Sequence, residues 1–234
     1  MIYIKSKKFG SLQTNCYLLS NKDSTIIIDP GEKSHKWIEE NSKNIKAIFL
    51  THGHYDHTAS LKKIILNNNS IPIYINILDK ELLKEDFSEQ EIDKYFTFFE
   101  KDIEIKINNF EHSFYLTHIP GHTSGSSGLY FKNNFFSGDL IFKNTVGRHN
   151  FWNSSVLEMK ESLKKLYALF NDSEEVIYIY PGHDSMMTFS ECKNTITTWI
   201  ELLNKKILKR NNSKNTNATS RQKAVYLNYK NKKD

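Results

Sequence analysis

Residues 51–57, with the sequence THGHYDH, hold three histidines and one aspartate within six consecutive positions. Imidazole and carboxylate groups at this density are the donors of a metal centre. On an extended backbone, side chains two positions apart point the same way, so His52 and His54 can bind one ion together. Asp56 and His57 follow where the chain must turn, so they can face a second ion. The spacing predicts a metal site rather than an ordinary polar turn.

Four other segments place a metal-binding side chain in a loop directly after a predicted strand. Loops at strand ends hold functional side chains on a rigid sheet. Any one Gly-His or Gly-Asp pair is common in ordinary turns. Together with residues 51–57, however, the four segments supply enough donors for two ions. They are Asp29-Pro30-Gly31, Pro120-Gly121-His122-Thr123, Ser137-Gly138-Asp139 and Pro181-Gly182-His183.

Strands and helices that could carry these loops are mixed along the chain. Runs of β-branched and aromatic residues bounded by Gly, Pro or Asn predict strands at residues 2–9, 16–20, 24–29, 45–50, 71–75, 103–107, 113–119, 128–132, 134–137 and 176–180. Helical patterns cover residues 34–41, 59–66, 79–94, 156–170 and 188–209. This mixture favours a layered α/β fold. It places residues 51–57 on a strand-to-helix connection.

Composition limits the size and class of the protein. The chain has 234 residues, 38% hydrophobic and 25% charged, which suits one substantial core and hardly two full domains. No apolar run approaches the roughly eighteen residues that span a bilayer, and the first residues alternate like an edge strand without a signal-peptide pattern. Two isolated thiols, Cys16 and Cys192, fit a reducing compartment. We therefore expect a cytoplasmic protein without a membrane partner.

Positive charge is concentrated at the C-terminal end. Residues 209–234 contain eight Lys or Arg and one Asp, a local excess of +7 (8 − 1). Because the whole chain has a net charge of +5, residues 1–208 carry −2 (5 − 7). A basic segment can attract polyanions, but a solvated terminus is the commoner case. We expect residues 1–208 to form the main domain and residues 209–234 a basic tail.

The motifs resemble those of the metallo-β-lactamase superfamily, and within it the glyoxalase II (hydroxyacylglutathione hydrolase)-like branch. The resemblance covers about residues 12–195. It implies a four-layer αβ/βα sandwich in which residues 1–208 form a hydrolase domain. The matching segments are TNCYL at 14–18, IDPG at 28–31, THGHYDHT at 51–58, PGHTSGS at 120–126, Gly138-Asp139, Gly147-Arg148 and PGH at 181–183.

The resemblance also implies how the donors divide between two divalent metal ions. It assigns His52, His54 and His122 to the first ion, Asp56, His57 and His183 to the second, and Asp139 to a bridge between them. Two ions about 3.5 Å apart lower the pKa of a bridging water toward neutrality and so provide a nucleophile. Asp56 and Asp139 are then the catalytic carboxylates. Mixed nitrogen and oxygen donors suit zinc first, with iron and manganese as alternatives.

Asp29 has two interpretations that the sequence leaves open. In similar proteins its counterpart orients a metal ligand or its loop. An aspartate before Pro-Gly can also stabilise the turn itself. The remaining histidines, His35, His112, His118 and His149, are expected to be surface or packing residues.

Arg148 is the candidate for substrate binding. It lies nine residues after Asp139, and in similar thioester hydrolases a basic residue there contacts the thiol carrier, whose carboxylate suits a guanidinium fork. Pairing with a local carboxylate is the alternative. The tyrosine signature of larger glyoxalase II enzymes is absent, and so is their C-terminal helical domain. We therefore expect a small-molecule thioester to be cleaved by a metal-bridging hydroxide, with the thiol carrier left open.

Other activities of the superfamily remain as alternatives. A persulfide dioxygenase keeps the Gly-Arg pair but uses a single iron held by two histidines and one aspartate. A secreted β-lactamase would need an export signal. A nuclease would need a nucleic-acid-binding arm or module, and the basic tail alone is a poor substitute for one. A binding protein without activity would be expected to have lost ligands. Nucleic acid is thus not the expected partner, and the oligomeric state stays open.

Overall fold

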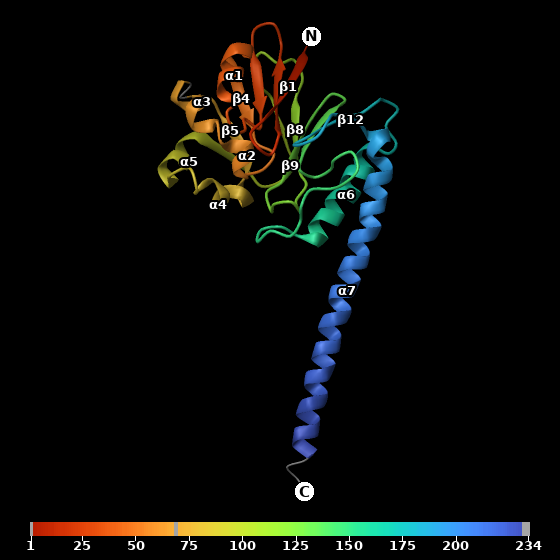
Figure 1. Ribbon diagram of the computed structural model, residues 1–234. Coiled ribbons are helices and arrows are strands. Elements are labelled where there is room, and N and C mark those ends of the chain that lie inside the picture. Colours follow the sequence, from red (N-terminus) through yellow and green to blue (C-terminus); the bar gives the residue numbers. More distant parts are fainter. Residues whose placement is uncertain (1, 68–69, 231–234) are drawn as a thin grey trace.

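Two six-stranded β-sheets pack face to face, with helices on both outer sides (Figure 1). The computed structural model describes residues 2–67 and 70–230, with side chains described up to residue 209. The layers follow the order helix, sheet, sheet, helix. The predicted four-layer αβ/βα sandwich is therefore confirmed.

The first sheet has the strand order β1-β2-β3-β4-β5-β6. The strands are β1 (Tyr3–Phe9), β2 (Thr14–Ser20), β3 (Thr25–Ile28), β4 (Ile45–Phe49), β5 (Ile73–Asn76) and β6 (Phe96–Phe99). Strands β1 to β3 are antiparallel, whereas β3 to β6 are parallel. Because the carboxyl ends of parallel strands meet at one sheet edge, the segments after β3, β4 and β5 begin on the same side of the molecule.

Short helices cover the outer face of this sheet or connect its strands. They are α1 (His35–Asn41), α2 (Tyr55–Thr58), α3 (Leu61–Asn67), the 3-10 helix η1 (Ile77–Asp79), α4 (Lys80–Leu83) and α5 (Glu89–Tyr95). Helix α5 begins with a capping box, in which Ser88 and Glu91 satisfy each other's backbone N–H groups.

The second sheet has the order β12-β11-β10-β9-β8-β7. Its strands are β7 (Ile103–Ile105), β8 (Phe114–His118), β9 (Ser127–Phe131), β10 (Asn134–Gly138), β11 (Tyr178–Pro181) and β12 (Met187–Thr188). All neighbours are antiparallel except β10 and β11. This parallel pair places the segments after both strands at the same edge of the sheet. The crossover between β10 and β11 contains α6 (Val156–Phe170), and α7 (Phe189–Lys230) follows β12.

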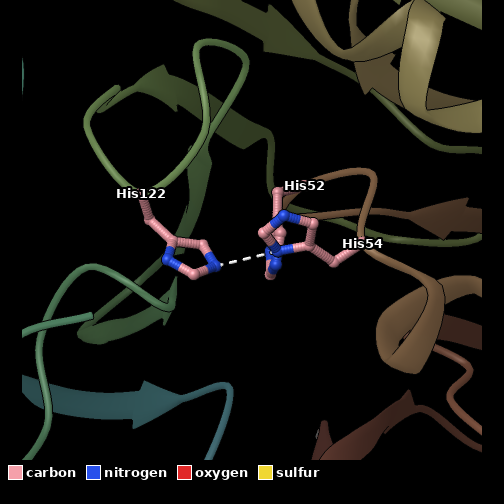
Figure 2. Close-up of side chains that lie close together, drawn as sticks. All are labelled: His52, His54 and His122. Carbon is pink, nitrogen blue, oxygen red and sulfur yellow. Dashed lines mark hydrogen bonds between the residues drawn. The ribbon is translucent and has the colours of Figure 1, made fainter. Parts of the chain in front are cut away.

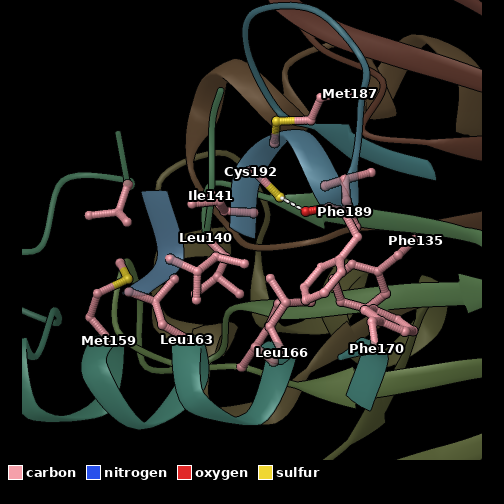
Figure 3. Packing of buried hydrophobic residues seen from close by; sticks show 14 of the residues in the cluster. Phe135, Leu140, Ile141, Met159, Leu163, Leu166, Phe170, Met187, Phe189 and Cys192 are labelled. Carbon is pink, nitrogen blue, oxygen red and sulfur yellow. Dashed lines mark hydrogen bonds between the residues drawn. The ribbon is translucent and has the colours of Figure 1, made fainter. Parts of the chain in front are cut away.

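Three apolar clusters fill the spaces between the layers. The central cluster lies between the sheets and includes the stacked rings of Phe114 and Phe131, whose centroids are 4.6 Å apart. A second cluster packs α1, α3 and α5 on the first sheet. The third packs α6 and α7 on the second sheet, with Leu163, Leu166 and Phe170 fully or nearly buried (Figure 3). Burial at this scale holds both sheets rigid behind the loops.

Several elements differ from the sequence predictions, among them β6, α7 and the short strand β12, which was not predicted. Strand β6, with the sequence FTFF, was not predicted, because a four-residue apolar run cannot be told from the end of a helix by periodicity. Helix α7 continues past its predicted end at residue 209 to Lys230 and projects from the domain (Figure 1). No Gly or Pro between these two positions stops it. The basic tail at 209–234 stays a prediction, and residues 231–234 lie outside the described chain.

None of the helices in the described ranges is long and apolar enough to cross a membrane. This includes α7, which is long but polar.

Candidate metal centre

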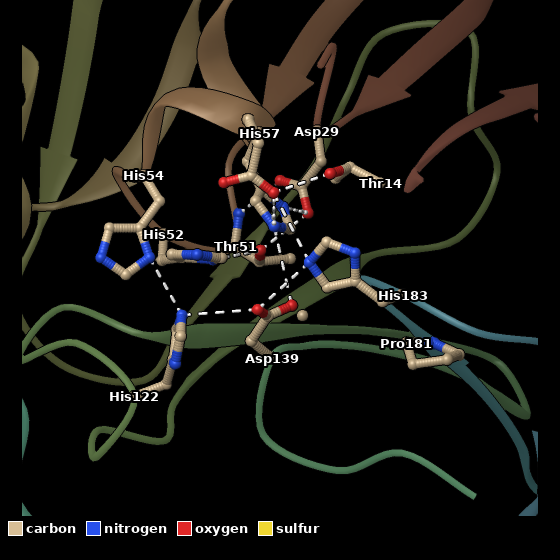
Figure 4. Close-up of polar contacts among 12 residues, drawn as sticks. Thr14, Asp29, Thr51, His52, His54, His57, His122, Asp139, Pro181 and His183 are labelled. Carbon is tan, nitrogen blue, oxygen red and sulfur yellow. Dashed lines mark hydrogen bonds and ion pairs between the residues drawn. The ribbon is translucent and has the colours of Figure 1, made fainter. Parts of the chain in front are cut away.

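The seven predicted ligands meet where the ends of the two sheets face each other (Figure 4). His52 and His54 follow β4, and Asp56 and His57 lie on the short helix α2 directly after them. The other three ligands follow strands of the second sheet: His122 after β8, Asp139 after β10 and His183 after β11. The centre is therefore assembled from both sheets.

The donor atoms fall into three overlapping groups, within each of which all atoms lie within 4.8 Å of one another. The first contains His52, His54 and His122, and the last contains Asp56, His57 and His183. The middle group joins His52 and His57 to Asp139. The two outer groups contain the same residues as the two predicted ligand sets, and Asp139 lies with one residue of each in the middle group.

Distances between neighbouring donor atoms fit metal coordination. Four donors at tetrahedral corners, each about 2.0–2.1 Å from a zinc ion, lie about 3.3 Å from one another. His54 Nδ1 and His122 Nε2 are 3.0 Å apart. The dashed line in Figure 2 joins these two rings. His57 Nε2 lies 3.3 Å from Asp56 Oδ2, and His122 Nε2 lies 3.4 Å from Asp139 Oδ2. His183 Nε2 lies 3.5 Å from Asp56 Oδ2 and 3.4 Å from Asp139 Oδ2.

Three buried atoms at this centre have no hydrogen-bond partner within the described part of the chain: His52 Nε2, His57 Nε2 and Asp139 Oδ1. Leaving a buried polar atom unpaired costs about 1–3 kcal/mol, and such atoms are rare in folded proteins. Coordination to a cation would satisfy all three at once. The residues present therefore fit a metal centre.

Four of the five histidines use one ring nitrogen to hold the ring in place. His122 Nδ1 donates to the Arg148 carbonyl across 2.7 Å, and His183 Nδ1 donates to the Leu12 carbonyl across 3.0 Å. His52 Nδ1 lies 3.1 Å from Thr51 Oγ1, which itself donates to Asp29. Because one nitrogen is fixed in this way, the other is aimed at the centre, where it can bind a metal after losing its proton.

Asp29 contacts a predicted ligand directly. Its Oδ2 accepts the His57 Nδ1–H across 2.9 Å, while the carboxylate also accepts the backbone N–H and the hydroxyl of Thr51 at 2.8 and 2.7 Å. Its backbone has a φ of +50°, in the left-handed region. Of the two interpretations of Asp29, the structure favours the orienting one. Thr14, for which no role was predicted, donates to Asp56 Oδ2 across 2.6 Å.

Charge and burial set opposite proton affinities within the donor set. Burial and the nearby rings of His57 and His122 hold the pKa of His52 well below its usual value. Burial also opposes the charged form of His57, but the carboxylates of Asp29 and Asp139 outweigh it and raise the His57 pKa to about 9. A bound cation would take the place of protons on these rings, and the same carboxylates would attract it.

Gly182 is required by the close packing behind the centre. A Cβ at this position would overlap the Asp139 carboxylate and would lie 2.8 Å from His57 Cε1. Any larger residue would therefore displace a predicted ligand. The Pro-Gly-His sequence thus has a steric reason in addition to the donor it supplies.

The loop that carries Arg148 borders the first donor group. The Arg148 side chain is exposed, and its guanidinium lies 4.4 Å from the centroid of the Phe151 ring. The Phe151 centroid in turn lies 5.3 Å from the ring of His54 and 5.8 Å from that of His122. Helix α7 reaches the same loop, since Lys206 Nζ lies 3.2 Å from His149 Nε2. Arg148 is thus placed beside the centre but does not touch its donors through its side chain.

The fold and this donor set define a metal-dependent hydrolase of the two-sheet sandwich class. The family model for the metallo-beta-lactamase superfamily matches residues 9–183. The chain therefore belongs to the metallo-β-lactamase superfamily.

Relatives and solved structures agree with this assignment. Hydroxyacylglutathione hydrolase 1 of Vibrio vulnificus is 31% identical over 169 residues, which are 69% of this chain and 59% of that protein. Hydroxyacylglutathione hydrolase GloC of Haemophilus influenzae is 29% identical over 201 residues, covering 79% of this chain and 92% of the relative. A crystal structure described as a di-iron-bound form has a TM-score of 0.66 and 26% identity, covering 81% of this chain and 96% of that one.

Proposed function

We propose that the protein is a binuclear metallohydrolase that cleaves a thioester of a small, carboxylate-bearing thiol. The observation that carries the proposal is the convergence of seven donor side chains into three overlapping groups, with Asp139 in the middle group. The hydroxyacylglutathione hydrolases among its relatives support the choice of a thioester. A cytoplasmic location and a small-molecule partner remain part of the proposal.

The first and last donor groups would hold the two ions. His52, His54 and His122 would bind one ion, Asp56, His57 and His183 the other, and Asp139 both. Zinc is our first choice, and iron or manganese would suit the same donors. When bound, the pair would supply a water of lowered pKa as nucleophile and would polarise the acyl oxygen.

The two sides of the centre differ in access. His52 and His57 are fully buried, so they form the rigid back of the centre. His54, Asp56 and His183 are partly exposed, so the acyl group would approach from their side. A thiol has a pKa near 8.5, so a thiolate can leave without a side chain that protonates it. The chain's own contribution is therefore to place the carbonyl beside the donors and to hold the thiol part.

Arg148 would hold the thiol part. Its guanidinium is exposed to an incoming carboxylate and is backed by the Phe151 ring, which limits its motion. A fork of two N–H groups would bind a carboxylate in a fixed orientation. Because this contact is remote from the reacting bond, it would contribute to binding more than to the chemical step.

A substrate panel on the metal-loaded protein tests the proposal. S-lactoylglutathione is compared with a thioester whose thiol lacks a carboxylate, with a phosphodiester and with glutathione persulfide, and Asp139→Asn serves as the control for contaminating activity. We expect the highest kcat/KM with the carboxylate-bearing thioester. Preferred phosphodiester cleavage would establish a nuclease, and oxygen consumption with the persulfide alone would establish a dioxygenase; either result overturns the thioester proposal.

A further inference from the structure

Asp79 is a fully buried carboxylate near the metal centre that is not one of the seven donors. It ends the 3-10 helix η1, which follows β5, and precedes α4. We propose that Asp79 is a positioning residue that ties the loop of His52 and His54 to the loop of His122, and so sets metal affinity at the first donor group. The inference rests on the proposed metal centre and not on the proposed substrate.

Each contact of the Asp79 carboxylate goes to one of these two loops. Gly53, which lies between His52 and His54, donates its backbone N–H to Oδ2 across 2.9 Å. Thr123, the residue after His122, donates its hydroxyl to the same oxygen across 2.8 Å. Gly125 donates its backbone N–H to Oδ1, also across 2.8 Å. One carboxylate thus joins segments that follow strands of different sheets.

Close packing confines the carboxylate to this position. A Cβ on Gly125 would lie 2.6 Å from Asp79 Cγ and 2.7 Å from Oδ1, so only glycine lets the turn approach it. The same turn is fixed internally, because Ser126 Oγ accepts the Thr123 N–H across 2.9 Å. Asp79 therefore contacts a rigid turn, and displacement of the carboxylate would be transmitted to His122.

The chemistry of the pocket requires a carboxylate rather than any polar group. Three donors point at two oxygens, and an ionised carboxylate accepts all of them. An amide offers only one acceptor oxygen and would turn its NH₂ toward at least one of the donors. Asp79→Asn should therefore leave a buried donor unpaired and push the two loops apart.

The spacing of the first donor group depends on this link. His54 Nδ1 and His122 Nε2, 3.0 Å apart, come from the two loops that Asp79 joins (Figure 2). The last group is held by other contacts, namely those of Asp29 with His57, Thr14 with Asp56 and the Leu12 carbonyl with His183. Loss of the Asp79 carboxylate should thus weaken one group and spare the other.

Titration of the metal-free, full-length protein with Co²⁺ against a competing chelator measures the two binding steps separately. The variants His54→Ala and His183→Ala show which step belongs to the first group and which to the last group. We expect Asp79→Asn to weaken binding at the first group by about 10–100-fold, as is common for residues that orient ligands, and to change the other step by less than about threefold. The visible spectrum of Co²⁺ at the first group should change in parallel.

Two further comparisons separate positioning from general destabilisation. Asn76→Ala removes a buried side chain from the same segment. The Asn76 side chain accepts from the Leu78 N–H and donates to the Glu100 carbonyl, and neither residue belongs to the ligand loops. The variant should lower the melting temperature and leave both affinities unchanged. Thr123→Val should weaken the first group, whereas Thr123→Ser, which keeps the hydroxyl, should not.

Wild-type affinity at both groups in folded Asp79→Asn would overturn the proposal. An equal loss at both groups, or the same loss in Asn76→Ala, would also overturn it, because Asp79 would then act through stability alone. If Asp79→Asn does not fold, the two Thr123 variants decide: equal affinities in both reject the role. If the predicted metal affinities are observed but the protein does not cleave thioesters, the proposed substrate is rejected and the proposed role of Asp79 is not.

Discussion

His57 lies between the carboxylates of Asp29 and Asp56. Its Nδ1–H donates to Asp29 Oδ2 across 2.9 Å (Figure 4), and its Nε2 lies 3.3 Å from Asp56 Oδ2. Asp29 thereby fixes the tautomer that leaves Nε2 free for a metal. Because Asp29 is also buried and bonded to Thr51, the ring has little freedom to turn. A histidine held in this way binds metal as a preformed ligand.

We predict that Asp29→Asn weakens metal binding at the group of Asp56, His57 and His183 by about 10–100-fold. The amide cannot replace the charge that favours donation from His57 Nδ1. Competition with a chelator measures the affinity. Asp172→Asn is the control, because Asp172 is exposed at the end of α6. An unchanged affinity in Asp29→Asn would show that Asp29 only stabilises its turn.

Arg148→Ala should raise KM for the carboxylate-bearing thioester by about tenfold, equal to about 1.4 kcal/mol, with little change in kcat. Arg148→Lys should fall between this variant and the wild type, because lysine keeps the charge and loses the fork. Steady-state kinetics on matched thioesters with and without the carboxylate provide the test. If Arg148→Ala affects both substrates equally, Arg148 does not bind the carboxylate.

Removal of metal should lower stability without unfolding the protein. The three apolar clusters do not involve the donors, but His52 Nε2, His57 Nε2 and Asp139 Oδ1 would remain buried without hydrogen-bond partners. A metal present at one hundred times its Kd stabilises a folded protein by about 2.7 kcal/mol per site. Thermal unfolding with and without a chelator, followed by circular dichroism, should show a lower Tm and an unchanged folded spectrum. Equal Tm values would contradict binding at this centre.

Truncation after Arg210 should leave kcat/KM within about threefold of the full chain. Among the residues whose side chains are described, α7 contacts the domain through Leu203, which is buried against α6, and Lys206, which lies beside His149. The matched variant Leu203→Ala should instead cost about 2–5 kcal/mol of stability. A tenfold loss of kcat/KM at physiological salt in the truncated chain, or about 1.4 kcal/mol, would make the basic tail part of the active site.

The resemblance of the motifs was sufficient to predict the four layers, and the residue types and spacings singled out the seven side chains that the structure brings together. Metal coordination demands particular residue types at fixed spacings, so residues 51–57 carry a signal that does not depend on tertiary context. The Gly-His and Gly-Asp segments were stronger candidates for metal ligands because each followed a predicted strand. The structure brings all seven side chains together.

The residues that support these donors could not be predicted from the sequence. Asp79 contacts segments 26 to 46 positions away and Thr14 contacts a residue 42 positions away, and a lone aspartate or threonine carries no local signal for such contacts. Strand β6 was missed for a related reason, since its place in the sheet is set by pairing with β5. Long-range packing decided each of these features.

The metal content of the purified full-length protein tests the central claim most directly. Elemental analysis after loading and removal of free metal should give close to two ions per chain. Asp139→Asn should hold fewer ions and lose most of its activity, because an amide cannot supply charge to both donor groups. A fully active protein with one ion per chain, or full activity in Asp139→Asn, would contradict the binuclear account.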